Sequence, residues 1–327
     1  MRALLLTQPS DGGAYTAALT EVDASGLPDA EVTIDIAHSS LNYKDGLAVT
    51  GTGKIVRGDF PFVPGIDLAG TVTRSDSDEW SSGERVVLTG WGTGEERWGG
   101  FAEQARAHPD HLVRLPDDLS TEQAMAIGTA GFTAMLAVMS IEEYVQEGRV
   151  AVSGATGGVG SFAVAFLASR GYEVVAATGK ADAGDYLRSL GAAEVVNRDE
   201  WSGKSRPMEK AKWAGAVDTV GGPTLAHLIA AADRHGVVAA CGNAASHSLE
   251  TTVFPFILRG VTLAGIDSNT CEPEQRKAAW GLIAEEVANG VLDRVDWKTI
   301  RLDEVIEYSA RIVEGKVRGR VVVDVRA

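Results

Sequence analysis

The sequence predicts a two-domain α/β protein, in which a β-rich domain is followed by a doubly wound, mostly parallel sheet. Three observations support this fold class. The 327 residues, 45% of them hydrophobic, are enough for two packed domains. Glycines and prolines punctuate short β-type runs over the first third of the chain. From Val150 to Ala177, a strand, a glycine-rich turn, a helix and a second strand then follow one another.

The first third contains five strand-like runs, and we expect no helix longer than a few turns there. The runs are Ala3 to Leu6, Glu31 to Ala37, Leu68 to Thr73, Arg85 to Leu88 and His111 to Arg114. A helix is expected to begin after Ser120, because Ser120 and Gln123 have the spacing of a capping box. A second helical stretch is expected from Gly131 to Met139.

The remainder alternates strands with helices, as a doubly wound sheet requires. The expected strands are Val150 to Ser153, Glu173 to Ala177, Glu194 to Val196, Ala216 to Thr219, Val237 to Cys241 and Thr262 to Ile266, with a helix from Ser161 to Arg170. Helices from Pro273 and Asp303 and a strand from Arg320 to Val325 close the chain. We expect this last strand to rejoin the β-rich domain. That domain is therefore placed at 1–122 and 269–327, and the parallel-sheet domain at 123–268.

Composition and charge exclude several classes of protein. The net charge of −15, from 30 basic and 45 acidic residues, disfavours binding to nucleic acid or to anionic membrane. The first apolar run ends at Thr7, too early for a signal peptide or a membrane span, so we expect a cytoplasmic protein. Its two cysteines, Cys241 and Cys271, are expected to be reduced thiols. The same acidity means that an acyl-CoA substrate would need a local basic patch.

The glycine-rich turn is the expected cofactor site. Gly158, Gly160 and Ala163 stand in the register of a dinucleotide-binding fingerprint between a strand and a helix. Glycine allows close approach of a pyrophosphate, and the helix N-terminus offers unpaired N–H groups to its oxygens. The alternative is a plain tight turn. The candidate contacts are Thr156, Gly157, Gly158, Val159 and Gly160.

The residues at the end of the strand Glu173 to Ala177, which follows the glycine-rich turn and its helix, indicate which dinucleotide binds. An NAD site places a carboxylate there, whereas this chain has Thr178, Gly179 and Lys180. Arg198, after the third strand, adds a second cation. We therefore expect NADPH, although each cation alone is consistent with a solvated surface residue.

Several stretches resemble the zinc-independent enoyl and quinone reductases of the medium-chain dehydrogenase/reductase superfamily, and within them the acryloyl-CoA reductases. The resemblance rests on residues 39–45 (SSLNYKD), 64–70 (PGIDLAG), 90–92 (GWG), 98–104 (WGGFAEQ), 126–134 (AIGTAGFTA), 213–221 (WAGAVDTVG) and 255–260 (PFILRG), and on the glycine-rich turn. It covers most of the chain.

The resemblance implies a GroES-like β-barrel catalytic domain, a Rossmann domain that binds NADPH, and an active-site cleft between them. It also implies a homodimer built through the last Rossmann strand, near Val261 to Ile266. The zinc alcohol dehydrogenases of this superfamily have a His-Glu pair where this chain has Ile66 and Asp67, and a catalytic Cys where it has none. We therefore expect no metal site.

Without a metal, hydride must go to an acceptor whose negative charge can spread, such as an enoyl thioester, an enone or a quinone. Tyr43 is expected to donate a hydrogen bond or a proton, because the matching tyrosine of the family lies near the nicotinamide; its alternative role is to pack against the cofactor. Asn42 and Asp45 are expected to fix the loop around it. Lys44 is expected to be solvated, and Asp67 to hold a loop.

Other residues have weaker assignments. Trp91, Trp98 and Phe101 are candidates to line a substrate pocket, with core packing as the alternative. The resemblance implies that Gly242 and Asn243 pass the nicotinamide, and Cys241 before them is expected to be an inert thiol.

Three functions remain open at this point. The first is NADPH-dependent reduction of a short 2-enoyl-CoA, acryloyl-CoA to propionyl-CoA. The second is reduction of a quinone or enone. The third is an NADPH-binding sensor or structural protein without turnover.

Overall fold

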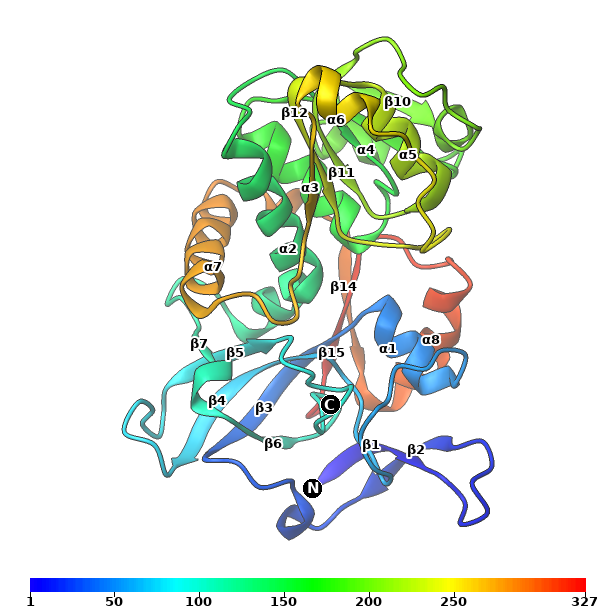
Figure 1. Cartoon of the computed structure of the whole chain (residues 1–327). Coiled ribbons are helices and arrows are strands. Elements are labelled where there is room, and N and C mark those ends of the chain that lie inside the picture. The colour runs from blue at the N-terminus through cyan, green and yellow to red at the C-terminus, as the bar shows by residue number, and fades with distance from the viewer. The chain divides into compact units, whose positions relative to one another are not determined.

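The computed structural model describes residues 1–327 and divides the chain into two compact units. The first unit comprises residues 1–129, 268–280 and 296–327, and the second comprises residues 130–267 and 281–295. The β-rich and parallel-sheet architecture expected from the sequence is confirmed (Figure 1).

The first unit is built on a seven-stranded sheet. Six strands lie in the order β14 (Trp297–Arg301), β15 (Arg320–Asp324), β3 (Val32–Leu41), β4 (Asp67–Ser75), β5 (Arg85–Thr89) and β7 (Val113–Arg114), and β6 (Gln104–Ala107) also pairs with β3. A hairpin of β1 (Arg2–Thr7) and β2 (Thr16–Glu21) and the helices α1 (Tyr43–Thr50) and α8 (Val305–Val313) complete it. Buried aliphatic side chains from β1, β3, β4, β5 and β15 form one core.

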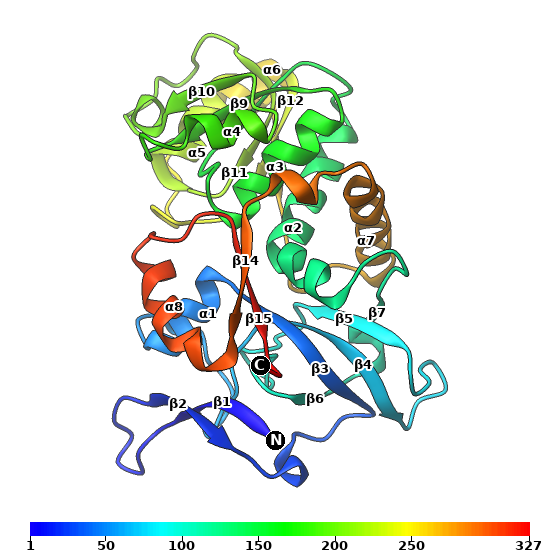
Figure 2. The ribbon, with the colours of Figure 1, turned by 180° about the vertical axis from the view of Figure 1, so that it is seen from behind.

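The C-terminal strand rejoins the first unit, as expected. β15 pairs antiparallel with β3, and Val321 lies opposite Leu41. Figure 2 shows the orange β14 and the red β15 beside the blue β3. This pairing brings Arg320, the first residue of β15, next to the residues that precede α1.

The second unit contains a six-stranded parallel sheet. Its order is β10 (Glu194–Asn197), β9 (Glu173–Thr178), β8 (Arg149–Val152), β11 (Trp213–Asp218), β12 (Ala232–Ala240) and β13 (Thr262–Gly265). The helices α3 (Gly158–Ser169), α4 (Gly184–Ser189), α5 (Gly222–Ala230) and α6 (Phe254–Arg259) connect these strands. Numbered along the chain, the strand order is 3-2-1-4-5-6, that of a Rossmann sheet. The point where the order reverses lies between β8 and β11, and dinucleotides bind at such a point.

The boundaries between the units differ from those expected at 122/123 and 268/269. The helix α2 (Thr121–Glu142) begins with the expected capping box, in which Ser120 and Gln123 exchange hydrogen bonds of 2.9 and 3.0 Å. It is kinked at Gly128, and the first unit extends to Thr129.

The helix α2 is therefore divided between the two units, and so is α7 (Pro273–Ala288). Residues 281–295 belong to the second unit, where Glu286 pairs with Arg170 at 3.0 Å.

The helix α2 is long and apolar enough to cross a membrane, but 83% of its apolar window is buried, as in the core helix of a soluble protein.

Candidate active site

The N-cap and first turn of α1 hold Tyr43, the expected donor, and Asn42 and Asp45, which were expected to fix the loop around it. Asn42 is the N-cap and Asp45 the third helical residue, and they form a capping box in which the Asn42 backbone N–H donates to Asp45 Oδ2 at 2.8 Å. Asp45 Oδ1 accepts from the Ile66 N–H at 2.9 Å. Tyr43 is the first helical residue, and its side chain is 50% exposed. The cap therefore fixes the backbone from which the Tyr43 hydroxyl projects.

Asp67, at the start of β4, is the centre of a buried cluster behind this turn. Its Oδ2 accepts from Ser40 Oγ at 2.5 Å, from Asn42 Nδ2 at 2.8 Å and from the Thr129 N–H at 2.9 Å. Its Oδ1 accepts from Thr129 Oγ1 at 2.5 Å. Four donors hold this carboxylate, so it ties α1, β3, β4 and the kink of α2 together, consistent with its expected role in holding a loop.

Arg320 supplies the positive charge of the cluster. Its guanidinium donates to Asn42 Oδ1 and Ser40 Oγ, both at 3.0 Å, and to the Ala126 carbonyl at 2.9 Å. Gly128 has φ +50°, and a Cβ on it would lie 2.6 Å from Asp67 Oδ2 and 2.7 Å from Arg320 Nη2. A side chain at position 128 would therefore push directly into this cluster.

The cluster holds two carboxylates and one guanidinium, all nearly inaccessible to solvent. Burial raises the pKa of Asp45 to about 7, and the nearby Asp67 adds to this effect. Burial also lowers the pKa of Arg320, which the two carboxylates oppose. Asp45 therefore exchanges its proton near neutral pH.

Lys44 has a partly exposed side chain, 41% accessible, in line with the expectation, but it also forms an ion pair. Its ammonium pairs with Glu95 Oε1 at 2.8 Å, and the other oxygen of the buried Glu95 pairs with Arg57 at 3.2 Å. Glu95 also accepts the backbone N–H of Arg57 through its carbonyl, at 2.6 Å. One buried carboxylate thus anchors the residue that follows Tyr43.

The residues around Asp67 do not fit a zinc ion. Both oxygens of Asp67 are occupied by hydrogen bonds, Ile66 has no ligand atom, and the Arg320 guanidinium provides the positive charge beside Asn42 and Ser40. The structure contains no group of three His, Cys, Asp or Glu residues that could hold a metal ion. Tetrahedral zinc needs thiolate, imidazole or free carboxylate ligands, and this site offers none.

The residues expected to contact a dinucleotide lie at the carboxyl ends of the strands of the second unit. The helix α3 begins at Gly158, three residues earlier than expected, and Gly157 is its N-cap. No side chain caps this end, so its first N–H groups are open to the oxygens of a phosphate. A Cβ on Gly160 would lie 2.3 Å from the Gly154 carbonyl oxygen, so Gly160 serves the packing of the helix on the turn. Thr156 and Val159 belong to the same turn and helix start.

The ends of β9 and β10 form a polar corner without a carboxylate at the end of β9, although Arg198, after β10, lies 3.9 Å from the Asp199 carboxylate. Thr178 and Asn197 are register partners, which places Arg198 beside Gly179. A Cβ on Gly179 would lie 2.5 Å from Arg198 Nε, and the Lys180 N–H donates to Thr178 Oγ1 at 3.1 Å. Arg198 and Lys180 are thus brought together, and these residues fit a 2′-phosphate.

The loop after β12 holds Gly242 and Asn243, which are both exposed. Cys241 before them donates its thiol to the Asp218 carbonyl oxygen at 3.3 Å. Burial and the charge of Asp218 raise the pKa of Cys241 to about 12, so it remains a thiol at neutral pH.

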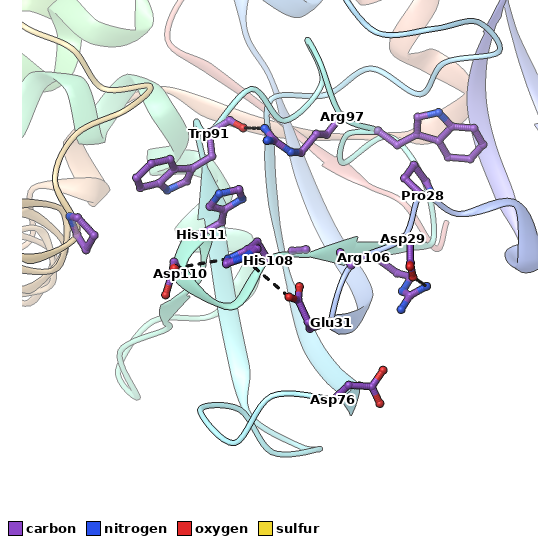
Figure 3. Close-up of a pocket in the computed structure, with 14 residues that line it drawn as sticks. Pro28, Asp29, Glu31, Asp76, Trp91, Arg97, Arg106, His108, Asp110 and His111 are labelled. Atoms are coloured by element: carbon purple, nitrogen blue, oxygen red, sulfur yellow. Dashed lines mark hydrogen bonds and ion pairs between the residues drawn. The ribbon is translucent and has the colours of Figure 1, made fainter.

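The aromatic residues expected in a substrate pocket divide into two groups. Trp91 lines a pocket of about 700 Å³ on the first unit (Figure 3), and Trp98 belongs to the same lining. Phe101 is instead fully buried in the core of this unit. His111 stacks on Trp91 with ring centroids 4.9 Å apart, and burial, with help from Arg97, lowers the pKa of His111 to about 4. The charged residues of the lining are Asp29, Glu31, Asp76, Asp110, Arg97 and Arg106. This pocket is therefore not the basic patch that an acyl-CoA needs.

The sequence did not reveal four residues that hold the start of α1 in place through hydrogen bonds or ion pairs. Ser40, Thr129 and Glu95 looked like ordinary strand, helix and loop residues, and Arg320 was expected only as the beginning of a strand. A basic residue at the first position of an otherwise apolar strand was the one available signal.

Comparison with known proteins agrees with both units. A model of the zinc-binding dehydrogenase family matches residues 158–285, and a model of the alcohol dehydrogenase GroES-like domain matches residues 28–117. The Escherichia coli K12 protein named "Probable acrylyl-CoA reductase AcuI" is 48% identical over 99% of this chain and 100% of its own length. The Bacillus subtilis protein named "Putative quinone oxidoreductase YhfP" is 42% identical over 92% of each chain.

A solved structure is similar to this chain in both fold and sequence. The YhdH oxidoreductase of Salmonella enterica in complex with NADP has a TM-score of 0.95 and 47% identity, over 99% of this chain and 100% of that one. The chain therefore belongs to the medium-chain dehydrogenase/reductase superfamily, in the branch of the acrylyl-CoA reductases.

Proposed function

We propose that this protein uses NADPH to reduce the carbon–carbon double bond of a short 2-enoyl-CoA, converting acryloyl-CoA to propionyl-CoA. The observation that carries the proposal is the identity of 48% to the E. coli acrylyl-CoA reductase over the whole length of both chains. The protein is an oxidoreductase, and its cofactor is NADPH, in agreement with the NADP complex of the Salmonella relative.

Bound NADPH supplies a hydride to the β-carbon of the enoyl group. Negative charge then develops on the thioester oxygen, and a proton must reach the α-carbon. We assign the stabilising hydrogen bond to the Tyr43 hydroxyl, because Tyr43 is half exposed at the capped end of a helix. Asn42 and Asp45 hold that end in place through the hydrogen bonds of the cap. Their role is to position Tyr43.

The experiment is a comparison of kcat/KM for acryloyl-CoA, crotonyl-CoA and a simple quinone, with NADPH as the reductant. We expect acryloyl-CoA to be the best of the three. Measurements at low and high ionic strength should show that kcat/KM for the acyl-CoA falls with salt, because its phosphates need cations in an acidic protein.

Quinone reduction is the second candidate, favoured by the 42% identity to YhfP and by the acidic lining of the pocket on the first unit. A quinone needs no basic patch. Efficient quinone turnover without acyl-CoA turnover would reverse the order of the two candidates.

We further propose that the protein is a cytoplasmic homodimer. β13 is an end strand of its sheet, with one side unpaired, and apolar side chains beside it are exposed. Val253, Phe254, Ile257 and Leu258 are 62%, 46%, 68% and 54% exposed. A patch of this kind next to an open strand edge fits a second copy of the chain. Neither Cys241 nor Cys271 forms a disulfide, which is consistent with a reducing compartment.

A further inference from the structure

Asp218, the last residue of β11, is a buried carboxylate that has no role in the proposed chemistry. It is fully inaccessible to solvent. It stands at the carboxyl end of the strand next to β8, and the order of the parallel sheet reverses between these two strands. A dinucleotide lies across such a reversal, so Asp218 is directly below the crevice in which the cofactor must bind.

The carboxylate joins two loops that border this crevice. Asp218 Oδ1 accepts from Ser153 Oγ at 2.6 Å, and Ser153 is the residue before the glycine-rich turn. Asp218 Oδ2 accepts from the Gly221 N–H at 2.7 Å, and Gly221 is the N-cap of α5. Ser153 Oγ in turn accepts from the Thr219 N–H at 3.0 Å. These hydrogen bonds connect the glycine-rich turn after β8 to the Thr219–Gly221 loop after β11.

The backbone of Asp218 reaches a third loop. Its carbonyl oxygen accepts from the Cys241 N–H at 2.9 Å. A Cβ on Gly242 would lie 2.4 Å from the Thr219 carbonyl oxygen, so the loop after β12 runs in direct contact with the loop after β11. The three loops that follow β8, β11 and β12 therefore meet at Asp218 and Thr219.

We propose that Asp218 is a positioning residue for hydride transfer, because its carboxylate sets the relative placement of the glycine-rich turn and the Thr219–Gly221 loop beneath the bound dinucleotide. This inference rests on the proposed function only in assigning NADPH to the crevice. The requirement is for a carboxylate, since both of its oxygens face donors. An amide that keeps its oxygen on the Gly221 N–H would turn its NH2 toward Ser153 Oγ, so the Ser153 hydroxyl hydrogen would lose the acceptor that Asp218 Oδ1 provides.

The test is the substitution Asp218→Asn, compared with Tyr172→Phe as a matched control. Tyr172 also makes one buried hydrogen bond in the second unit, from its hydroxyl to the Val145 carbonyl oxygen at 2.6 Å. It lies before β9, at the opposite edge of the sheet from the carboxyl ends. The readouts are the Kd for NADPH from the fluorescence of the bound cofactor, the rate of hydride transfer in a single turnover, and the melting temperature.

We expect Asp218→Asn to raise the Kd for NADPH at least fivefold and to slow hydride transfer at saturating NADPH at least tenfold. Tyr172→Phe should lower the melting temperature by a comparable amount and leave both cofactor readouts at their wild-type values. Wild-type Kd and hydride transfer in Asp218→Asn, or equal losses in the two variants, would overturn the proposal.

A second variant keeps the test decisive if Asp218→Asn does not fold. Ser153→Ala removes the side-chain hydrogen bonds between the two loops and leaves the carboxylate with its bond to Gly221, and it should show the same changes to a smaller degree. Because the Kd for NADPH is measured without an acceptor, it is independent of whether acryloyl-CoA is the substrate. A chain that binds NADPH normally and reduces only quinones would contradict the proposed substrate and leave the role of Asp218 intact.

Discussion

Arg320 and Asp67 are joined through two shared partners, since Ser40 and Asn42 each hydrogen-bond to both of them. The guanidinium and the carboxylate are both buried, and a second carboxylate, Asp45, lies in the same cluster. This arrangement places a fixed positive charge at the capped end of α1.

The first prediction concerns this charge. Arg320→Gln should lower the free energy of unfolding by about 3–5 kcal/mol, because it leaves the buried Asp67 carboxylate and the ionised fraction of Asp45 without a compensating cation. The measurement is urea denaturation at neutral pH. Arg74→Gln is the control: Arg74 is exposed and pairs with Asp76 at 3.0 Å, and losing such a pair should cost less than about 1 kcal/mol. Similar losses in both variants would contradict the assigned role of Arg320.

The second prediction is a pH dependence of stability that originates at Asp45. Its pKa is about 7 in the folded protein, against about 3.9 for an unperturbed aspartate. Between these values the folded state holds a proton that the unfolded state releases. The contribution of Asp45 to stability is therefore complete below pH 4, is lost as the pH rises to about 7, and is constant above that.

Unfolding free energies measured from pH 4.5 to pH 8 check this trend. The stability of the wild type relative to Asp45→Asn should fall as the pH rises and then level off. The exposed Asp118 provides the control variant, Asp118→Asn, which should show no such trend. A constant difference between wild type and Asp45→Asn would show that Asp45 does not titrate in this range.

How much the sequence predicts depends on the range of the interactions involved. The strands β8 and β9 were expected almost at their observed limits, and the helix between them with a start three residues too late, because apolar runs and glycine punctuation are local signals. The capping box of Ser120 and Gln123 was found for the same reason. The strands β2, β6 and β14 and the helix α1 were not expected, since they are short and their apolar patterns are weak.

The buried cluster lay beyond sequence reasoning. The hydrogen bond from Arg320 to Ser40 joins residues 280 positions apart, and only the pairing of β15 with β3 brings them together. The kink at Gly128, which delivers Thr129 to Asp67, depends on the same tertiary contacts. Asn42, Tyr43 and Asp45 were identified through the family resemblance, whereas Arg320 and Glu95 emerged only from the fold.

The third prediction is the preference for NADPH. Arg198→Ala should raise the Kd for NADPH about tenfold, the effect of one partly solvated charge-assisted hydrogen bond, because Arg198 lies over Gly179 beside Lys180. The Kd for NADH should change less than about twofold. Both are measured by the fluorescence of the bound nucleotide, with Arg188→Ala on the exposed side of α4 as the control. Equal losses for NADH and NADPH would place Arg198 outside the 2′-phosphate site.

The fourth prediction concerns the proposed dimer. The wild type should elute with twice the mass of one chain in light scattering coupled to gel filtration. Ile257→Asp should shift it toward the mass of one chain, because it places a charge in the apolar patch of α6. The matched change Ile306→Asp, on the exposed face of α8, should leave the mass unchanged. A wild type that runs as a single chain would remove the proposal.

The last prediction is the role of the Tyr43 hydroxyl. Tyr43→Phe should lower kcat by roughly one to three orders of magnitude, the range for loss of a single acid or oxyanion donor. The melting temperature and the Kd for NADPH should barely change, because the side chain is half exposed and its hydroxyl has no partner within the protein. Tyr144→Phe, a change at another exposed tyrosine, is the control and should retain wild-type turnover. If Tyr43→Phe turns over at the wild-type rate, the residue only packs against the cofactor, and the enolate must take its proton from water or from a hydroxyl of the nucleotide.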